Sequence, residues 1–118
     1  MQPVILVAED EELIRFIVAE YLSDAGFGVV EASNAADALS VISSMAAVDL
    51  VFTDINMPGD MDGNALADWL LVHRPDIPVL LTSGVSRPRP RNGGWKRRFL
   101  LKPYALVDVE KSIRELLH

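Results

Sequence analysis

The sequence predicts an α/β protein in which five parallel strands form one sheet with helices on both faces. Short apolar runs recur along the 118-residue chain, and between them lie stretches whose apolar residues repeat at helical spacing. The segments that join these elements are short, which is typical of βαβ units with right-handed crossovers. For a chain of this length the pattern favours the flavodoxin-like strand order 2-1-3-4-5.

Each expected strand is a short, mostly apolar run, as in a parallel sheet that is buried on both faces. The runs lie at residues 4–7, 28–32, 48–53, 77–81 and 99–101. The third run ends at Asp54, and Pro58 and Gly59 turn the chain just beyond it. A carboxylate is therefore expected at the carboxyl end of a buried strand, where open α/β sheets place their ligands.

Four amphipathic stretches predict helices between and after these strands. Their apolar positions are Leu13, Ile14, Ile17, Val18, Tyr21 and Leu22, then inward-facing Ala38, Leu39, Val41, Ile42 and Met45, then Leu66, Trp69 and Leu70 within 63–73, and Leu106, Val109, Ile113, Leu116 and Leu117 within 105–117. Gly26 suits the turn after the first helix, and Asn34 is a good N-cap for the second. Ala105 takes the N-cap position of the last helix, where Ser, Thr or Asp would be worth about 1 kcal/mol more.

The stretch from Val85 to Gly94 breaks this rhythm, because Pro88, Pro90, Gly93 and Gly94 oppose a regular helix. Six of the eleven basic residues cluster in and just after it: Arg87, Arg89, Arg91, Lys96, Arg97 and Arg98. The rest of the chain carries five basic and seventeen acidic residues. An acidic body of this kind argues against general nucleic-acid binding.

The composition limits the classes of protein to consider. There is no cysteine, so the chain has neither a disulfide framework nor a thiolate metal site. No apolar run approaches the roughly 18 residues of a membrane span, and no basic n-region of a secretory signal precedes Glu9. We expect a single cytoplasmic domain over residues 1–118 that does not act at a membrane.

Polar residues follow four of the five expected strands. They are Glu9 and Asp10 after the first, Asp54 after the third, Thr82 and Ser83 after the fourth, and Lys102 after the fifth. Because the carboxyl ends of parallel strands meet at one edge of the sheet, we expect three carboxylates, a hydroxyl and an ammonium to gather there. Clustered carboxylates repel, and a hard divalent ion such as Mg²⁺ is their natural partner.

This set of side chains suits phosphoryl transfer. Asp54 is placed as a nucleophile that forms an acyl phosphate. The cation and Lys102 would neutralise charge on the transferring group, and Thr82 would donate a hydrogen bond to it. Each residue alone also has a structural interpretation, such as helix-dipole or turn chemistry for Glu9, Asp10 and Thr82. Their joint placement favours the site.

Five motifs in order along the chain resemble those of a known family. They are Val7-Ala8-Glu9-Asp10-Glu11, Thr53-Asp54-Ile55-Asn56-Met57-Pro58, Asp62-Gly63, Pro78-Val79-Leu80-Leu81-Thr82-Ser83-Gly84 and Lys102-Pro103-Tyr104. Together they resemble the receiver domains of two-component response regulators, of the chemotaxis-regulator-like type with a single receiver domain. The resemblance covers essentially the whole chain.

The resemblance implies a cation-dependent acceptor site. It makes Asp54 the phosphoacceptor and Mg²⁺ or Mn²⁺ the cofactor. Asp10 and Asp54 would bind the ion directly, Asn56 would bind it through its backbone carbonyl, and Glu9 would act through a metal-bound water. 

The resemblance also implies a switch and a set of partners. Thr82 would be the switch hydroxyl, Lys102 its charge partner, and Phe99 the aromatic residue that turns inward on activation. The phosphoryl group would come from a sensor histidine kinase or a histidine phosphotransfer protein, and the output would be an unknown downstream protein, without direct contact to nucleic acid. Such a chain catalyses only its own phosphorylation and dephosphorylation and is not otherwise an enzyme. A stand-alone regulator and a receiver of a hybrid sensor kinase both stay open.

Two segments depart from the family pattern. The loop after Asp54 is one residue longer than the usual Met-Pro-x-Met-Asp-Gly motif, as Met57-Pro58-Gly59-Asp60-Met61-Asp62-Gly63. The fourth helix of the family falls on 85–98, where we expect an irregular or shortened element. Its basic cluster is either a mobile or partner-specific patch of a remodelled output surface or a solvated loop.

Three other functions stay open. A haloacid-dehalogenase-like phosphatase has a second Asp two residues after its nucleophile, where this chain has Asn56. A flavin- or nucleotide-binding module has a glycine-rich phosphate loop, where this chain has the acidic run from Glu9 to Glu12. A pseudo-receiver binds partners without being phosphorylated.

Overall fold

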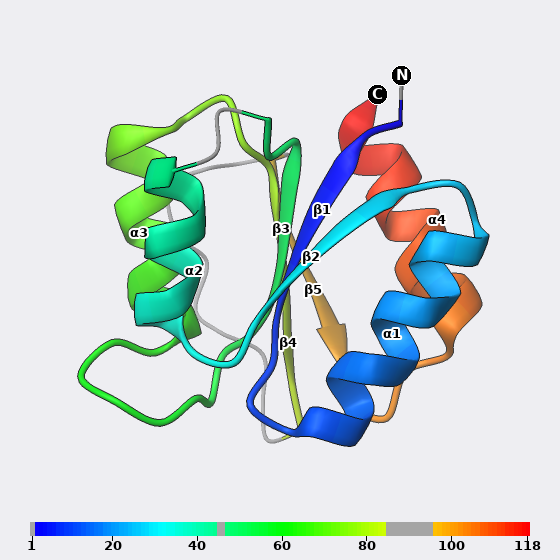
Figure 1. Cartoon of the computed structure of the whole chain (residues 1–118), viewed down its shortest axis with the longest axis horizontal. Coiled ribbons are helices and arrows are strands. Elements are labelled where there is room, and N and C mark those ends of the chain that lie inside the picture. The colour runs from blue at the N-terminus through cyan, green and yellow to red at the C-terminus, as the bar shows by residue number, and fades with distance from the viewer. Residues whose placement is uncertain (1, 45–46, 85–95) are drawn as a thin grey trace.

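The structure is a computed structural model of the chain, and it describes residues 2–44, 47–84 and 96–118. Its five strands form one parallel sheet in the order β2-β1-β3-β4-β5. Helices cover both faces of this sheet, with α2 and α3 on one face and α1 and α4 on the other (Figure 1). The predicted fold class and strand order are confirmed.

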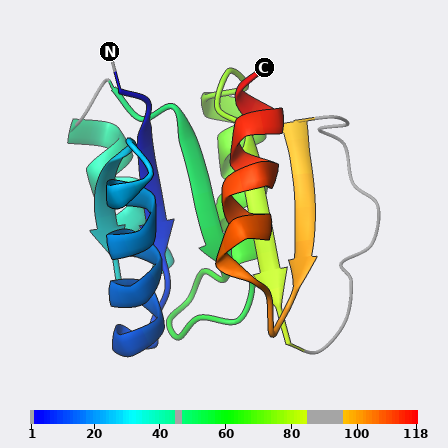
Figure 2. The same cartoon turned by 90° about the vertical axis from the view of Figure 1, so that its right-hand side faces the viewer.

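The elements alternate along the chain as the sequence predicts. They are β1 (Val4–Ala8), α1 (Glu12–Asp24), β2 (Gly28–Ala32), α2 (Ala35–Ser44), β3 (Leu50–Asp54), α3 (Gly63–His73), β4 (Val79–Ser83), β5 (Arg97–Leu101) and α4 (Leu106–Leu117). In Figure 2 the arrowheads of the strands point to the same edge of the sheet. The carboxyl ends of β1, β3, β4 and β5 therefore lie together.

Three strand boundaries differ from the prediction by two residues at their start. β3 and β4 begin later than predicted. Just before β3, the Asp49 carboxylate accepts the Val4 amide at 2.7 Å, and at its other end β4 includes Thr82 and Ser83. β5 begins earlier, at Arg97. The guanidinium groups of Arg97 and Arg98 leave the edge strand to pair with carboxylates of α3 and α4, so the charges do not prevent strand pairing.

The predicted irregular helix lies outside the described residues, since the structure does not describe 85–95. The part of the basic cluster that is described, from Lys96 to Arg98, is held in place. Lys96 donates to the Pro75 carbonyl at 2.8 Å, and Arg97 pairs with Asp68 at 3.2 Å. These three residues therefore take part in the fold, and the interpretation of the basic cluster as a mobile or partner-specific patch stays a prediction.

Two apolar cores hold the sheet, one on each face. Alternation along each strand sends Leu6, Val51 and Leu81 to the side of α2 and α3. Their neighbours Ile5, Leu50 and Leu80 face α1 and α4. The cores fix the sheet on which the polar edge is built. Among the described residues, none of the helices combines the length and apolar character needed to cross a membrane.

The helices bury most of the predicted apolar positions. Those fully buried are Val18, Leu22, Ala38, Ile42, Leu66, Leu70, Val109, Ile113 and Leu116, and those partly buried in a core are Ile14, Tyr21, Leu39, Val41, Trp69, Leu106 and Leu117. Met45 lies outside the described residues. Leu13 and Ile17 are 70% and 43% exposed, so part of the apolar repeat of α1 lies on the surface.

The helix ends follow the predicted capping. Asn34 Oδ1 accepts the Asp37 amide at 2.7 Å, and Gly26 follows α1 with φ of 101°. Ala105 is the N-cap of α4, with extended backbone and no side-chain hydrogen bond. An amide in the first turn of α4 thus lacks the side-chain acceptor that Asn34 supplies to α2.

We expect Ala105→Ser to raise the free energy of unfolding by about 1 kcal/mol, because a hydroxyl at the N-cap accepts a hydrogen bond from the first turn. Urea unfolding followed by circular dichroism measures the change. Asn34→Ala is the matched control and should lower the same quantity by about 1 kcal/mol. A stabilisation absent in Ala105→Ser, with the expected loss in Asn34→Ala, would contradict the prediction.

Candidate functional site

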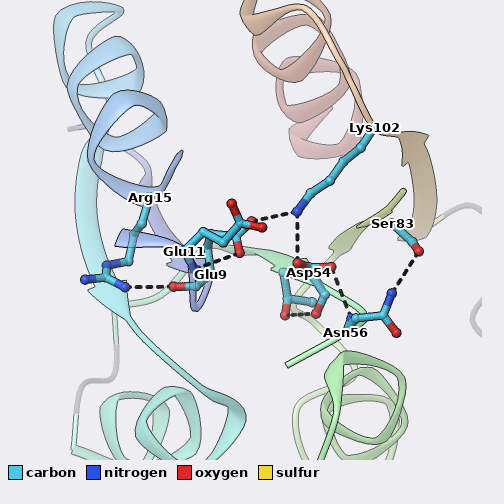
Figure 3. A network of polar contacts seen from close by, with 8 residues as sticks. Glu9, Glu11, Arg15, Asp54, Asn56, Ser83 and Lys102 are labelled. Carbon is cyan, nitrogen blue, oxygen red and sulfur yellow. Dashed lines mark hydrogen bonds and ion pairs between the residues drawn. The ribbon is translucent and has the colours of Figure 1, made fainter. Parts of the chain in front are cut away.

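The structure brings Glu9, Asp54 and Lys102 together at the carboxyl edge of the sheet (Figure 3). Glu9 follows β1, Asp54 ends β3, and Lys102 follows β5. Lys102 Nζ lies 3.0 Å from Glu9 Oε1 and 2.9 Å from Asp54 Oδ2. Three strand ends that are far apart in the sequence therefore meet in one ionic cluster, as predicted.

Asp10 completes an acidic group with Glu9 and Asp54. One carboxylate oxygen of each lies within 4.8 Å of the others. Glu9 and Asp54 are buried, whereas Asp10 is exposed, so the group opens to solvent on the Asp10 side. An all-oxygen, anionic donor set of this kind fits a hard divalent cation such as Mg²⁺.

Burial is the main cause of the altered acid–base behaviour of Glu9. It raises the pKa of this carboxyl to about 7, and the charge of Asp54 acts in the same direction, against the hydrogen bonds from the Glu11 amide and Lys102. Burial also disfavours the charged form of Lys102, but its hydrogen bonds to Asp54 and Glu9 outweigh burial and raise its pKa. Lys102 thus stays an ammonium, and a further cation would favour the ionised form of Glu9.

The Asp54 carboxylate is fixed on both oxygens. Oδ2 accepts from Lys102, and Oδ1 accepts from the Asn56 amide at 3.1 Å. The Asn56 side chain donates in turn to Ser83 Oγ at 3.1 Å, which ties the loop after β3 to the end of β4. The carboxylate that the sequence singles out is held in one orientation.

Thr82 lies beside Asp54 in register on β4 and is buried. Its hydroxyl has no hydrogen-bond partner among the described residues. It lines a small cleft together with Glu9, Asp54 and Tyr104. Leaving a buried hydroxyl without a partner costs about 1–3 kcal/mol of folding free energy. A ligand oxygen bound at this edge could accept a hydrogen bond from the Thr82 hydroxyl and remove that cost.

Phe99 does not lie at this cleft. It pairs in register with Leu81 and packs half-buried against the core under α2 and α3, whereas Thr82 pairs with Leu100. The cleft at Thr82 is lined by residues of the core under α1 and α4, including Phe52. The switch role implied for Phe99 stays a prediction.

Two residues at the site were not singled out from the sequence. Tyr104 packs edge-on against Phe52, with ring centroids 5.7 Å apart, and burial raises its pKa to about 12. Arg15 donates to the Glu9 carbonyl at 2.8 Å. Tyr104 stands within the Lys102-Pro103-Tyr104 motif, and Arg15 is the first basic residue after the acidic run, but neither position alone reveals these contacts.

The geometry and the sequence now identify the family. Residues 5–114 match the family model described as "Response regulator receiver domain". The chain therefore belongs to the response regulator receiver domains, the phosphorylation-switched modules of two-component signalling.

The chain is similar to one part of several longer regulatory proteins. It is 32% identical to the C4-dicarboxylate transport transcriptional regulatory protein DctD of Rhizobium meliloti, over 95% of this chain and 25% of that protein. It is 34% identical to the transcriptional regulatory protein PdtaR of Mycobacterium tuberculosis, over 92% of this chain and 54% of that protein. The chain thus spans only part of these curated relatives.

Solved structures show the same fold over nearly the whole chain. The response regulator TrrA of Thermotoga maritima, solved in complex with Mg²⁺ and BeF, superposes with a TM-score of 0.85 at 28% identity, covering 98% of this chain and 99% of that one. The receiver domain of the hybrid histidine kinase CckA gives a TM-score of 0.82 at 28% identity, with the same coverage.

The connection from β3 to α3 predicts a stability effect at Gly63. Its amide donates to the Ile55 carbonyl at 2.9 Å, and a Cβ at this position would overlap the Asp54 carbonyl oxygen. We expect Gly63→Ala to lower the free energy of unfolding by about 2–3 kcal/mol, because backbone atoms must move apart. Gly84→Ala is the control, since its Cβ would lie an ordinary 3.8 Å from Lys102 Cβ. Equal stability of the two variants in urea unfolding would contradict this prediction.

The raised pKa of Glu9 predicts how the stability of the metal-free protein depends on pH. The carboxyl pKa rises from 4.5 to about 7 on folding, so the folded chain holds this proton more tightly. The resulting stability is fully present below about pH 4.5 and is lost as the pH rises to about 7. We expect unfolding in EDTA to require on the order of 1–2 kcal/mol less free energy above pH 7 than near pH 5. Glu9→Gln should remove most of this difference, and an unchanged pH profile in that variant would assign it to other groups.

Proposed function

We propose that Asp54 accepts a phosphoryl group from a histidine of a sensor kinase or phosphotransfer protein, with Mg²⁺ bound beside it. The observation that carries this proposal is the fixed Asp54 carboxylate, which pairs with Lys102 and lies beside the carboxylates of Glu9 and Asp10. In this proposal Asp10, Asp54 and the Asn56 backbone carbonyl hold the ion, and Glu9 binds one of its waters. Mn²⁺ would serve in place of Mg²⁺, since it takes the same oxygen donors.

In the proposed reaction an oxygen of Asp54 attacks the phosphorus of a phosphohistidine. The P–N bond breaks as the P–O bond forms, and the imidazole leaves with its electron pair and takes up a proton. The bound ion supplies charge neutralisation for the transferring group. Lys102 is placed to donate to a second phosphoryl oxygen as its charge partner. The Thr82 hydroxyl, which has no partner among the described residues, would donate to a third.

Dephosphorylation is the proposed second half of the cycle. Water attacks the phosphorus of the acyl phosphate, the bond to the Asp54 oxygen breaks, and the carboxylate and inorganic phosphate are released. The chain then acts on itself and does not turn over a free substrate. A phosphatase with a general acid two residues after the nucleophile is disfavoured, because Asn56 carries no acidic proton and its side chain is engaged with Ser83.

The surface beside the site suggests where the phosphodonor docks. An apolar groove of about 550 Å³ runs between α1 and the segment after β5, and Ile17, Lys102 and Tyr104 are among the residues that line it. Leu13 and Phe16, 70% and 56% exposed, extend the apolar surface along α1. A donor histidine that reaches Asp54 past Lys102 would bring its own helix over this groove, which favours an apolar helical partner.

The proposal extends to the domain as a whole, its location and its switch residues. We propose that residues 1–118 form one receiver domain that acts in the cytoplasm, as the absence of cysteine suggested. Thr82 and Phe99 are the proposed switch residues that report phosphorylation to an unidentified downstream protein. The chain acts either as a stand-alone regulator or as a receiver of a hybrid sensor kinase, and its similarity to the receiver domain of the hybrid histidine kinase CckA supports the second arrangement.

Incubation with Mg²⁺ and acetyl phosphate tests the acceptor directly. We expect intact mass spectrometry to show one phosphoryl group per wild-type chain, none on Asp54→Asn, and a wild-type level on the control Asp60→Asn, whose exposed carboxyl lies in the following loop. Loss of the modification when EDTA replaces Mg²⁺ is also expected. A wild-type chain that stays unmodified would favour a pseudo-receiver, and modification of Asp54→Asn would place the acceptor elsewhere.

A further inference from the structure

We propose that Arg15 is a positioning residue that holds the loop between β1 and α1 in the conformation that cation binding requires. This inference rests on the proposed cation site. The guanidinium of Arg15 makes two contacts at once: Nη1 donates to the Glu9 carbonyl at 2.8 Å, and Nε donates to Glu31 Oε1 at 3.2 Å (Figure 3 shows the first). The Arg15 side chain is only 17% exposed. One side chain of α1 thereby joins the end of β1 to β2.

Glu9 is the point at which the chain leaves the sheet. Its amide donates to the Ala32 carbonyl at 3.0 Å, its carbonyl accepts from Arg15, and its carboxylate accepts from the Glu11 amide at 3.1 Å and from Lys102. Every polar group of this residue is therefore engaged. The peptide unit that Arg15 holds is the one that joins Glu9 to Asp10, so the contact fixes the backbone from which the Asp10 side chain extends.

The start of α1 explains why a contact from within the helix is needed. Its N-cap residue, Glu11, makes no side-chain capping hydrogen bond. The loop before the helix therefore lacks the usual side-chain cap, and Arg15 supplies a fixed contact from the second turn. The planar guanidinium can serve a carbonyl and a carboxylate together, which an ammonium cannot do in the same geometry.

The ion pair with Glu31 orients the Arg15 guanidinium. Arg15 lies near an acidic group that would attract it, and a guanidinium bound to Asp10 or Asp54 would compete with a divalent ion. The ion pair with Glu31 instead holds Arg15 on the β2 side, where it contacts the backbone of Glu9. Held there, the guanidinium occupies no ligand position.

Arg114 in α4 provides a control, because it makes similar contacts far from the carboxyl edge of the sheet. Arg114 also joins a backbone carbonyl to a carboxylate, with Nη2 donating to the Ala25 carbonyl at 3.0 Å and Nε donating to Glu110 Oε2 at 2.9 Å. Arg114→Met removes the same two types of hydrogen bond as Arg15→Met, together with a contact of the guanidinium over the Phe27 ring at 4.7 Å, and it does so away from the acidic group. The pair separates an effect on the site from a general effect on stability.

The test is a Mg²⁺ titration without any phosphodonor, followed by calorimetry and by the amide resonances of Asp10 and Asp54. We expect Arg15→Met to weaken Mg²⁺ binding by about tenfold or more, the range found when groups that orient metal ligands are removed. Arg15→Lys should recover part of the affinity, because an ammonium can still reach the Glu9 carbonyl. Arg114→Met should bind as the wild type does, and urea unfolding in EDTA records the stability of each variant.

The outcomes separate this inference from the proposed function. Wild-type affinity in Arg15→Met, or an equal loss in Arg114→Met, would overturn the positioning role. A wild-type chain that binds no Mg²⁺ would overturn the cation site itself. A wild-type chain that binds Mg²⁺ but is never phosphorylated would overturn the proposed function, while a selective loss in Arg15→Met would still support the role of Arg15.

Discussion

The shared ammonium of Lys102 is the interaction on which the site depends. Burying two carboxylates is costly unless a cation compensates, and Lys102 serves Glu9 and Asp54 together. The three residues stand at the ends of β1, β3 and β5. β1 and β3 are neighbours and β4 lies between β3 and β5, so the contact exists only in this strand order and register. A slip of β5 by one residue would send Lys102 to the opposite face. The two apolar cores therefore determine the ionic cluster by fixing the register of the sheet.

The charge balance of this edge explains why it suits a ligand. In their ionised forms the three carboxylates outnumber the ammonium by two, which is the charge of one divalent ion. Without that ion the imbalance is relieved by the raised pKa of Glu9, and Thr82 keeps a buried donor without a partner among the described residues. Both features cost stability, and both are relieved by a cation and a tetrahedral oxyanion bound at the same place. The edge is thus organised for its ligands at the expense of the ligand-free fold.

The sequence was sufficient for the features that follow from periodicity and from sheet geometry. Apolar runs and helical spacing predict the elements, and parallel strands necessarily bring Glu9, Asp54 and Lys102 to one edge. Features that depend on the reach of long side chains were missed or misplaced. Arg97 and Arg98 belong to β5, and their guanidinium groups pair with acidic side chains of α3 and α4. Arg15 donates to the Glu9 carbonyl, six residues earlier in the chain. Helical spacing likewise predicts an amphipathic α1 but does not say that Leu13 stays uncovered.

The end of β4 limits how the proposed phosphorylation at Asp54 could be transmitted to the rest of the fold. Its backbone is engaged on both sides, since the Thr82 carbonyl accepts the Ile55 amide at 2.8 Å and the Ser83 carbonyl accepts the Lys102 amide at 2.9 Å. The Thr82 hydroxyl, in contrast, has no partner among the described residues, so it can turn toward a phosphoryl oxygen without breaking a bond that the structure shows there. Phe99 packs on the other face of the sheet, beside Leu81. A change at Thr82 therefore has no direct side-chain route to Phe99 in this conformation, and coupling between them requires movement of the β4–β5 pair itself, with the Lys102 amide as the nearest link to the site.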